Sequence, residues 1–287
     1  MKLKSFWDLM RLDHGVMLFI AILIGSIVSN SSTLLDISKL ILSFFTALFL
    51  EASTFALNDY MDLEIDKKNK RYDRPLVRGD IQPSTALVLF YLLLPLGIIC
   101  SFLVNLQCFF IALITALFAI AYDVKIKKIK TLGNFYIAYI MAVPFLFGAV
   151  AVSQTISAIV WILASISFFV GVGREIMKDV MDMTGDKSQG IRSLPLYIGE
   201  RNAYRVAAFF YIISVVMSFV PFFLLKDTTY YQNMIYLAFV GLTDIIFLIT
   251  AIALLVKTSP PVTLYRKTTL VAMVFGLFAF LLGALRW

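Results

Sequence analysis

Two short acidic segments of this chain place carboxylates one helical turn apart. In the first, NDYMDLEID at residues 58–66, polar ladder positions recur at intervals of four: Asn58, Asp62 and Asp66. In the second, DVMDMTGD at residues 179–186, the corresponding positions are Asp179, Asp182 and Asp186. Residues three or four apart lie on the same face of a helix. Each segment is therefore predicted to present a row of oxygen ligands, named here the first and the second ladder.

Rows of like charge need a cationic partner. Like charges at this spacing destabilise an isolated helix by about 0.2–0.5 kcal/mol per pair, and carboxylates near a bilayer cost more. One alternative is a solvated helix end whose acids pair with nearby basic residues, namely Lys67, Lys68, Arg71, Lys178 or Lys187. Two such ladders favour Mg²⁺, which prefers oxygen ligands and commonly bridges carboxylates to a phosphorylated substrate. Neither segment contains His or Cys, which argues against zinc or copper.

The ladders lie in a chain built almost entirely of apolar runs. Of its 287 residues, 61% are hydrophobic and 15% are charged, whereas soluble chains are roughly half apolar and a quarter charged. A bilayer span takes about 20 apolar residues. The runs predict nine spans, at about 15–30, 36–57, 83–103, 105–122, 132–151, 156–178, 203–225, 232–256 and 268–285. The expected fold class is all-α, a multi-span transmembrane helical bundle, with residues 1–287 forming a single membrane domain.

Basic residues mark one side of this bundle. All but three of the 25 Lys and Arg residues lie before the first span or in the regions of the even-numbered loops, span ends included; the exceptions are Lys39, Lys226 and Arg286. The positive-inside rule therefore places the N-terminus and both ladders in the cytoplasm and the C-terminus outside the cell membrane. This asymmetry accounts for the net charge of +7, and we expect no nucleic-acid partner.

Charged residues at the mouth of an apolar bundle predict a substrate that is charged at one end and apolar at the other, namely a diphosphate carried on a lipid. Metal ions and basic side chains stabilise a leaving diphosphate as its carbon–oxygen bond breaks. The apolar helices would hold the hydrocarbon chain. A secondary transporter is the alternative from another class, but transporters hold such acids near the bilayer midplane, whereas these ladders stand at the cytoplasmic ends of spans.

Both acidic segments resemble those of the UbiA superfamily of intramembrane prenyltransferases. NDYMDLEID is similar to that family's N-D-x-x-D-x-x-x-D signature, and DVMDMTGD to its second motif, D-x-x-x-D. The position of the motifs after spans two and six extends the resemblance over the whole chain. It implies nine helices around a central cavity that opens sideways to lipid and is capped by cytoplasmic loops. It also implies that Mg²⁺, and through it a prenyl diphosphate, is bound by Asn58, Asp62, Asp66, Asp182 and Asp186, with Asp59 and Asp179 assisting.

A third element of that family, Tyr-x-x-x-Lys, follows the fourth span and contacts the diphosphate. In this chain Tyr122 is followed four residues later by Ile126, with Lys125 and Lys127 on either side. This departure leaves two candidate lysines, of which we favour Lys127. The alternative, that the loop is only a positively charged anchor, stays open.

Three stretches resemble the archaeal branch of the family, which transfers a geranylgeranyl group to geranylgeranylglyceryl phosphate: RYDRPLVRGDI, KTLGN and GREIMKDVMDMTGDKSQGIRSLP. The resemblance implies a lipid-phosphate acceptor whose hydroxyl attacks an allylic cation and forms an ether. Arginine suits phosphate through its planar fork of donors. The candidates are Arg71, Arg74, Arg78, Arg174 and Arg192, with Arg11 at the cavity mouth. Branches that prenylate aromatic acceptors, such as 4-hydroxybenzoate or a naphthoate, remain the alternative.

Acids inside spans are functional candidates by default. Glu51, seven residues before Asn58, is expected to orient the acceptor or its proton. Asp244, in the eighth span, could equally join two helices through a hydrogen bond. His14 is expected to form hydrogen bonds at the membrane–water interface. Aromatic residues would shield the cation in a dry cavity, the candidates being Phe55, Tyr136 and Tyr139. No obligate protein partner is inferred.

Overall fold

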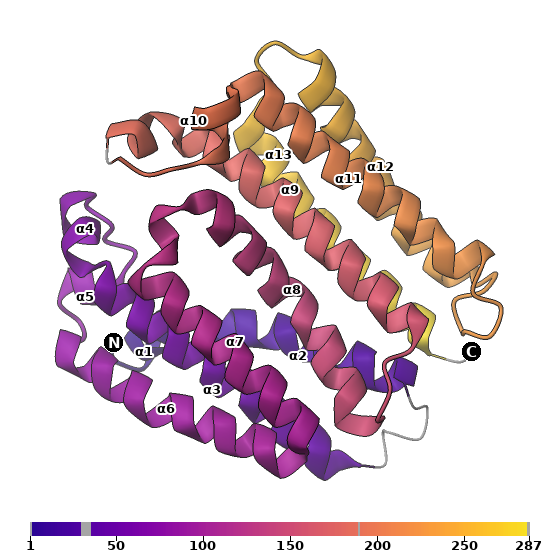
Figure 1. Ribbon diagram of the computed structural model, residues 1–287, viewed down its shortest axis with the longest axis horizontal. Coiled ribbons are helices and arrows are strands. Elements are labelled where there is room, and N and C mark those ends of the chain that lie inside the picture. The colour runs from indigo at the N-terminus through magenta and orange to yellow at the C-terminus, as the bar shows by residue number, and fades with distance from the viewer. Residues whose placement is uncertain (1, 30–35, 189, 286–287) are drawn as a thin grey trace.

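The computed structural model describes residues 2–29, 36–188 and 190–285, and nearly all of this described chain is helical. Figure 1 shows the helices as long rods with short connections. In chain order they are α1 (Lys2–Met10), α2 (Leu12–Ser29), α3 (Ile37–Met61), α4 (Leu63–Lys68), α5 (Pro75–Arg78), α6 (Pro83–Val104), α7 (Leu106–Val124), η2, a 3₁₀ turn (Ile126–Lys128), α8 (Lys130–Val152), α9 (Ala158–Ser188), α10 (Leu194–Ile198), α11 (Glu200–Phe223), α12 (Met234–Val256) and α13 (Val262–Ala284).

Eight of the described helices are long and apolar enough to cross a membrane, namely α3, α6, α7, α8, α9, α11, α12 and α13. Helices α1 and α2 meet the same criteria together, bent by 51°, which brings the count to nine if the bent pair is one span. The bend falls at Arg11, whose φ of 47° lies in the left-handed region that a straight helix does not use. The prediction of an all-α membrane bundle is confirmed.

Two helices extend well beyond the spans predicted from the apolar runs. The sixth span was expected to end at residue 178, but α9 continues to Ser188, so the second ladder lies inside a continuous helix. The ninth was expected to begin at residue 268, but α13 begins at Val262. In both places charged residues end the apolar run while the backbone hydrogen bonds of the helix continue. An apolar run therefore measures only the lipid-compatible part of a helix.

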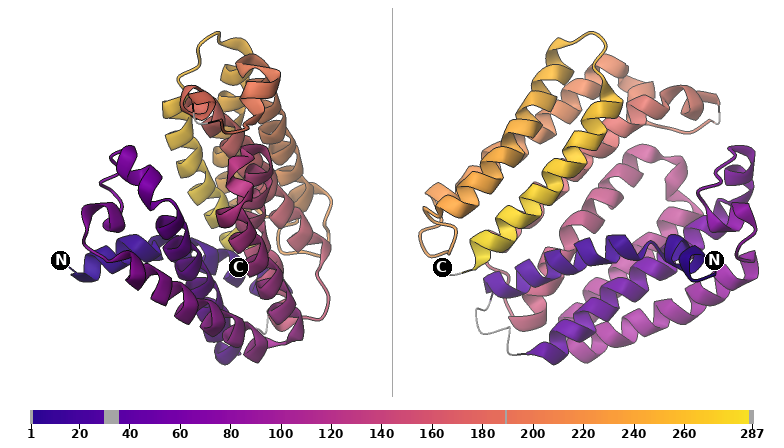
Figure 2. Two further views of the ribbon diagram at one scale, coloured as in Figure 1. Left: turned by 60° about the vertical axis from the view of Figure 1, so that its left-hand side comes forward. Right: turned by 180° about the vertical axis from the view of Figure 1, so that it is seen from behind.

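The spans form two groups joined through α8. Figure 1 shows α3, α6 and α7 together on one side and α9, α11, α12 and α13 on the other, with α8 between them. Seen from behind in Figure 2, α2 crosses the bundle beside α3. Helices α2 and α8 touch through glycines, since a Cβ at Gly25 would collide with the carbonyl oxygen of Phe145, and one at Gly148 with that of Ile22. Small residues at a crossing let two membrane helices pack backbone to backbone.

The short elements gather at one end of the bundle. Figure 1 places α4, α5 and α10 at the same end, beside the start of α8. The connection after α7 is tied to the one after α9, because Ile129 and Arg192 form a parallel β-bridge and the Lys130 amide donates to the Arg192 carbonyl at 2.8 Å. The segments that carry the two ladders and the basic loops therefore converge on one site.

Candidate active site

A cavity of about 790 Å³ opens at this end of the bundle, among α2, α3, α7, α8 and α9. Its polar end is lined by Asn58, Asp62, Asp66, Asp123 and Asp179. Its apolar walls include Leu18, Leu50, Ile111, Ile137, Ile140 and Phe147. The space thus combines a charged end with a hydrocarbon-lined interior, as a lipid diphosphate requires.

The first ladder crosses the junction between α3 and α4. Asp62 lies at that junction with φ −94° and ψ −1°. Its amide donates to the Asn58 carbonyl at 2.9 Å, and the Asp66 amide donates to the Asp62 carbonyl at 2.8 Å. The predicted one-turn spacing therefore survives, although one straight helix does not carry it.

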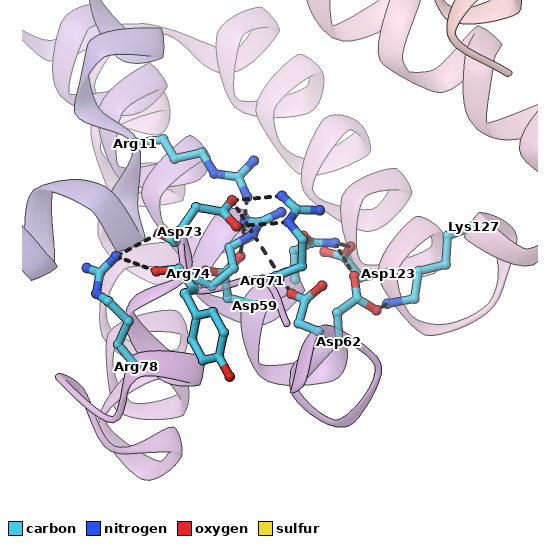
Figure 3. A network of polar contacts seen from close by, with 12 residues as sticks. Arg11, Asp59, Asp62, Arg71, Asp73, Arg74, Arg78, Asp123 and Lys127 are labelled. Atoms are coloured by element: carbon cyan, nitrogen blue, oxygen red, sulfur yellow. Dashed lines mark hydrogen bonds and ion pairs between the residues drawn. The ribbon is translucent and has the colours of Figure 1, made fainter. Parts of the chain in front are cut away.

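Side-chain hydrogen bonds connect a further acid, Asp123, to the first ladder. The Asn58 Nδ2 donates to Asp62 Oδ2 at 3.3 Å and to Asp123 Oδ1, at the end of α7, at 2.7 Å. Lys127 pairs with Asp62 from the turn that follows (Figure 3). Burial, and next the neighbouring Asp62, raises the pKa of Asp66, so this carboxyl gains from a nearby cation.

Asp59 faces two arginines that line the cavity. Its side chain is 1% exposed, and Arg11 donates to Asp59 Oδ1 at 3.3 Å. Arg74 pairs with the same oxygen, and its Nε lies 3.8 Å from Asp66 Oδ2. The Arg11 guanidinium also lies 4.0 Å from the ring centroid of Phe55, a cation–π contact. Figure 3 shows Arg11, Arg74 and Asp59 meeting beside Asp62 and Asp123.

The second ladder converges on one ammonium group. Lys130 Nζ lies 2.8 Å from Asp186 Oδ1, 3.2 Å from Asp182 Oδ2 and 3.7 Å from Asp179 Oδ1. Asn134, one turn further along α8, donates to Asp179 Oδ2 at 2.7 Å. The three acids therefore share one face of α9, as their spacing predicted.

The donor set of both ladders fits a hard divalent cation. Among the described residues, no three His, Cys, Asp or Glu side chains stand close enough to hold a metal by themselves. Mg²⁺ needs fewer protein ligands, since it keeps several waters and binds through one or two carboxylates together with substrate phosphates. The carboxylate oxygens Asp59 Oδ2, Asp123 Oδ2 and Asp186 Oδ2 are buried and accept no hydrogen bond within the described chain. The Lys130 ammonium stands among three carboxylates as a cation would.

The structure separates the two candidate lysines. Lys127 lines the cavity, whereas Lys125 is exposed and lies outside it. Tyr122 also lines the cavity, with its ring stacked on Tyr136 at 4.8 Å between centroids. Gly133 permits this arrangement, because a Cβ there would lie 2.9 Å from Tyr122 Cε2.

Several other sequence candidates lie elsewhere. The expectation that Tyr139 lines the cavity is wrong, because its hydroxyl faces Thr115 at 2.8 Å between α7 and α8. Arg71 also lies outside the cavity wall and binds Asp73 through Nε at 2.9 Å. Asp244 accepts a hydrogen bond from Ser218 at 2.7 Å, which joins α12 to α11.

Arg78, Arg174 and Arg192 are likewise absent from the lining of the cavity. Arg78 binds Asp80 at 2.8 Å and Asp8 at 3.2 Å, which fastens α5 to α1. Two lysines named in the alternative of a solvated helix end, Lys67 and Lys178, contact Glu64 and Glu175, both at 3.0 Å, rather than ladder acids.

Sequence reasoning missed four residues of the site: Asp123, Lys130, Asn134 and Glu175. Asp123 directly follows Tyr122 at the end of an apolar run, and Asn134 lies four residues after Lys130, hence on the same helix face. Glu175, four residues before Asp179, extends the second ladder by a turn and also lines the cavity. Helical spacing counted outward from Lys130 and Asp179 would have found Asn134 and Glu175.

Comparison with known proteins decides the family. The model of the UbiA prenyltransferase family matches residues 18–262, most of the chain and both ladders. The chain belongs to the UbiA prenyltransferase family. The resemblance predicted from the two acidic motifs is confirmed, and this UbiA-family prenyltransferase is a multi-pass integral membrane protein.

Its sequence relatives extend over the full length. The UbiA-family chain is 44% identical over 283 residues to a digeranylgeranylglyceryl phosphate synthase of Archaeoglobus fulgidus, which covers 98% of this chain and 96% of the relative. A digeranylgeranylglyceryl phosphate synthase of Methanocaldococcus jannaschii is 36% identical over 287 residues, covering 99% and 98%.

Solved structures share the fold. One, described as giving structural and mechanistic insights into digeranylgeranylglyceryl phosphate synthase in membranes, has a TM-score of 0.82 at 36% identity and covers 99% of this chain and 98% of its own. A UbiA homolog from Archaeoglobus fulgidus bound to DMAPP and Mg²⁺ has a TM-score of 0.65 at 17% identity, with coverage of 96% and 99%. The helical membrane bundle is therefore the UbiA fold.

Proposed function

We propose that this UbiA-family prenyltransferase transfers a geranylgeranyl group from geranylgeranyl diphosphate to the hydroxyl of geranylgeranylglyceryl phosphate, forming the second ether bond of an archaeal lipid. One observation carries the assignment: a single cavity joins the first ladder, Asp179 of the second ladder and several cations to long apolar walls. The acceptor follows the full-length relatives at 44% and 36% identity, both named digeranylgeranylglyceryl phosphate synthase.

Mg²⁺ is the proposed cofactor, and when bound it supplies positive charge that stabilises the leaving diphosphate. The residues that would hold it are Asn58, Asp62, Asp66, Asp182 and Asp186, with Asp59 and Asp179 assisting. The orphaned Asp186 Oδ2 and the carboxylates gathered at Lys130 support this choice.

Different side chains of the cavity neutralise the diphosphate, shield the allylic cation and hold the prenyl chain. Lys127, rather than Lys125, neutralises the diphosphate, because it stands beside Asp62 on the cavity wall. Tyr122 and Tyr136 form an aromatic wall next to it that shields the allylic cation from water. The apolar walls hold the prenyl chain and keep water out.

Two arginines of the cavity wall are available to bind the phosphate of the acceptor. Arg11 and Arg74 line the cavity, and both contact the buried Asp59, which orients them. Arginine presents a planar fork of donors that matches phosphate. We propose these two, rather than Arg71, for the acceptor phosphate.

We further propose that residues 1–287 act as one domain in the cell membrane, with the N-terminus and the site cytoplasmic and the C-terminus outside. The basic loops lie at the ladder end, where α4, α5 and α10 gather (Figure 1). Cysteine labelling from each side of a sealed vesicle, with single cysteines introduced at Lys70 and Asp227, would test the orientation.

The decisive experiment compares acceptors. Purified protein in detergent, given Mg²⁺ and geranylgeranyl diphosphate, is expected to release diphosphate and form the doubly prenylated ether with geranylgeranylglyceryl phosphate. A parallel reaction with 4-hydroxybenzoate should give no product. Turnover that persists in EDTA, or in Asp62→Ala and Asp182→Ala, would contradict the metal assignment. Product from the aromatic acceptor alone would contradict the acceptor.

A further inference from the structure

Glu51 is an acid of the cavity wall that belongs to neither ladder. It lies on α3, seven residues before Asn58, which places it two helical turns, or about 10 Å, from the first ladder towards the apolar interior. Its side chain is 13% exposed. A diphosphate bound at the ladders would leave its first prenyl carbon pointing in this direction. Glu51 therefore stands on the side of the reacting carbon.

Two further polar residues of α3 in the wall are threonines whose hydroxyls bond to their own helix. Thr46 donates to the Leu42 carbonyl at 2.9 Å and Thr54 donates to the Leu50 carbonyl at 2.8 Å. A neutral threonine hydroxyl is a much weaker base than a carboxylate. Among the described lining residues deeper than the ladders, Glu51 and Glu175 carry the carboxylates.

The neighbours of Glu51 differ from those of Glu175, an acid on the opposite wall. Lys178 donates to Glu175 at 3.0 Å and Arg174 lies 3.9 Å away, so its negative charge is neutralised. His14 Nδ1 lies 3.8 Å from Glu51 Oε1, and the His14 side chain is 47% exposed. Arg11 interacts electrostatically with Glu51, and the same Arg11 also pairs with Asp59.

An imidazole beside a carboxylate is suited to passing on a proton, because its charge changes near neutral pH. The ring of His14 is held edge-on against Phe55, at 5.6 Å between centroids. The pair therefore reaches from the inside of the cavity to an exposed edge of the molecule.

We propose that Glu51 is the catalytic base that takes the proton from the acceptor hydroxyl. This assignment rests on the function proposed above. As the allylic carbon–oxygen bond breaks, its electron pair leaves with the diphosphate. A lone pair of the acceptor oxygen forms the new carbon–oxygen bond, and the oxygen–hydrogen bond gives its proton to the Glu51 carboxylate. His14 then takes the proton to water, so that charge and atoms balance.

Glu51→Gln keeps the size of the side chain and removes the base. A general base contributes about 10²–10⁴-fold to rate, so kcat for ether formation is expected to fall by about a hundredfold or more while KM for geranylgeranyl diphosphate stays the same. Ionisation continues, and water then captures the cation. The ratio of geranylgeraniol to ether lipid should therefore rise, an effect that a merely structural role would not produce.

Asp244→Asn is the matched control, because it makes the same change at another buried acid, one that bonds Ser218 away from the cavity. It should leave the product ratio unchanged. The midpoint of thermal unfolding shows whether Glu51→Gln is folded. If the wild type forms the ether and Glu51→Gln matches its rate and product ratio, the base assignment is wrong. If the wild type forms no ether from these substrates, the proposed function itself is wrong.

Discussion

Lys130→Met removes the ammonium that the second ladder shares and leaves most of the aliphatic chain in place. The three carboxylates now lie 2.8, 3.2 and 3.7 Å from Lys130 Nζ. The side chains of Asp179 and Asp186 are only 2% and 6% exposed. Without the lysine, and without metal, these negative charges face one another with little water to screen them.

The size of the effect follows from this burial. Removing one partner of a buried ion pair costs about 3–5 kcal/mol. Because Asp182 is 46% exposed and partly screened, we expect the lower end, about 3 kcal/mol. At about 2–4 °C per kcal/mol, the unfolding midpoint in EDTA should fall by about 6–12 °C.

Mg²⁺ should reverse most of this loss. A ligand at a hundred times its Kd stabilises the folded state by about 2.7 kcal/mol. In the wild type the metal must first displace Lys130 from the carboxylates, so the same titration should raise the midpoint less. The assay is scanning fluorimetry of the detergent-solubilised protein in EDTA and over a Mg²⁺ series, which does not depend on activity.

Lys125→Met is the matched control, since Lys125 is an exposed lysine of the same connection. It should unfold like the wild type at every Mg²⁺ concentration. The reasoning is refuted if Lys130→Met has the wild-type midpoint in EDTA, or if Mg²⁺ raises the midpoints of both proteins equally.

Other contacts predict measurable effects. Lys127→Met should lower kcat for prenyl transfer by about 10²–10³-fold, the cost of losing one charge-stabilising donor, whereas Lys125→Met should not; equal losses would contradict the placement of Lys127. The Arg71 hydrogen bond lowers the pKa of Asp73, so their pair stabilises its loop above the ordinary carboxyl pKa and is lost as the pH falls below about 4. Limited proteolysis of this loop should accelerate there, and Arg71→Gln should remove the pH dependence. Gly148→Ala forces α8 away from α2 and should destabilise the protein by about 1–3 kcal/mol, measured as the unfolding midpoint; an unchanged midpoint would show that the crossing relaxes freely.

Periodicity predicted the contacts that run along one helix. Asp179, Asp182 and Asp186 share a face of α9 because the backbone there is regular, and all three reach Lys130. The Asn58–Asp123 contact joins residues 65 positions apart. Such a pair depends on how α3 packs against α7, which spacing within one segment does not encode.

The choice between Lys125 and Lys127 shows the same limit at shorter range. In a regular helix, residues four apart share a face, which would have placed Ile126 beside Tyr122. Helix α7 ends at Val124 instead, and Lys125 has φ −138° and ψ −45°. The 3₁₀ turn η2 follows, and Lys127 comes to face Asp62. The position of Lys127 in the cavity wall therefore depends on the turn that follows α7, whose geometry the apolar run does not encode.

The segment between α7 and α8 links the two ladders electrostatically. Lys127 pairs with Asp62 of the first ladder, and Lys130, three residues later, holds the second. Both lysines are therefore bound to acids proposed as Mg²⁺ ligands, so metal and lysine compete for the same oxygens. With those acids holding Mg²⁺, both ammonium groups would be free to face the phosphate oxygens of the substrate. Since the Lys130 amide is also bonded to the Arg192 carbonyl, Lys130 connects the second ladder to the loop after α9, whose Gly190 and Ile191 line the cavity.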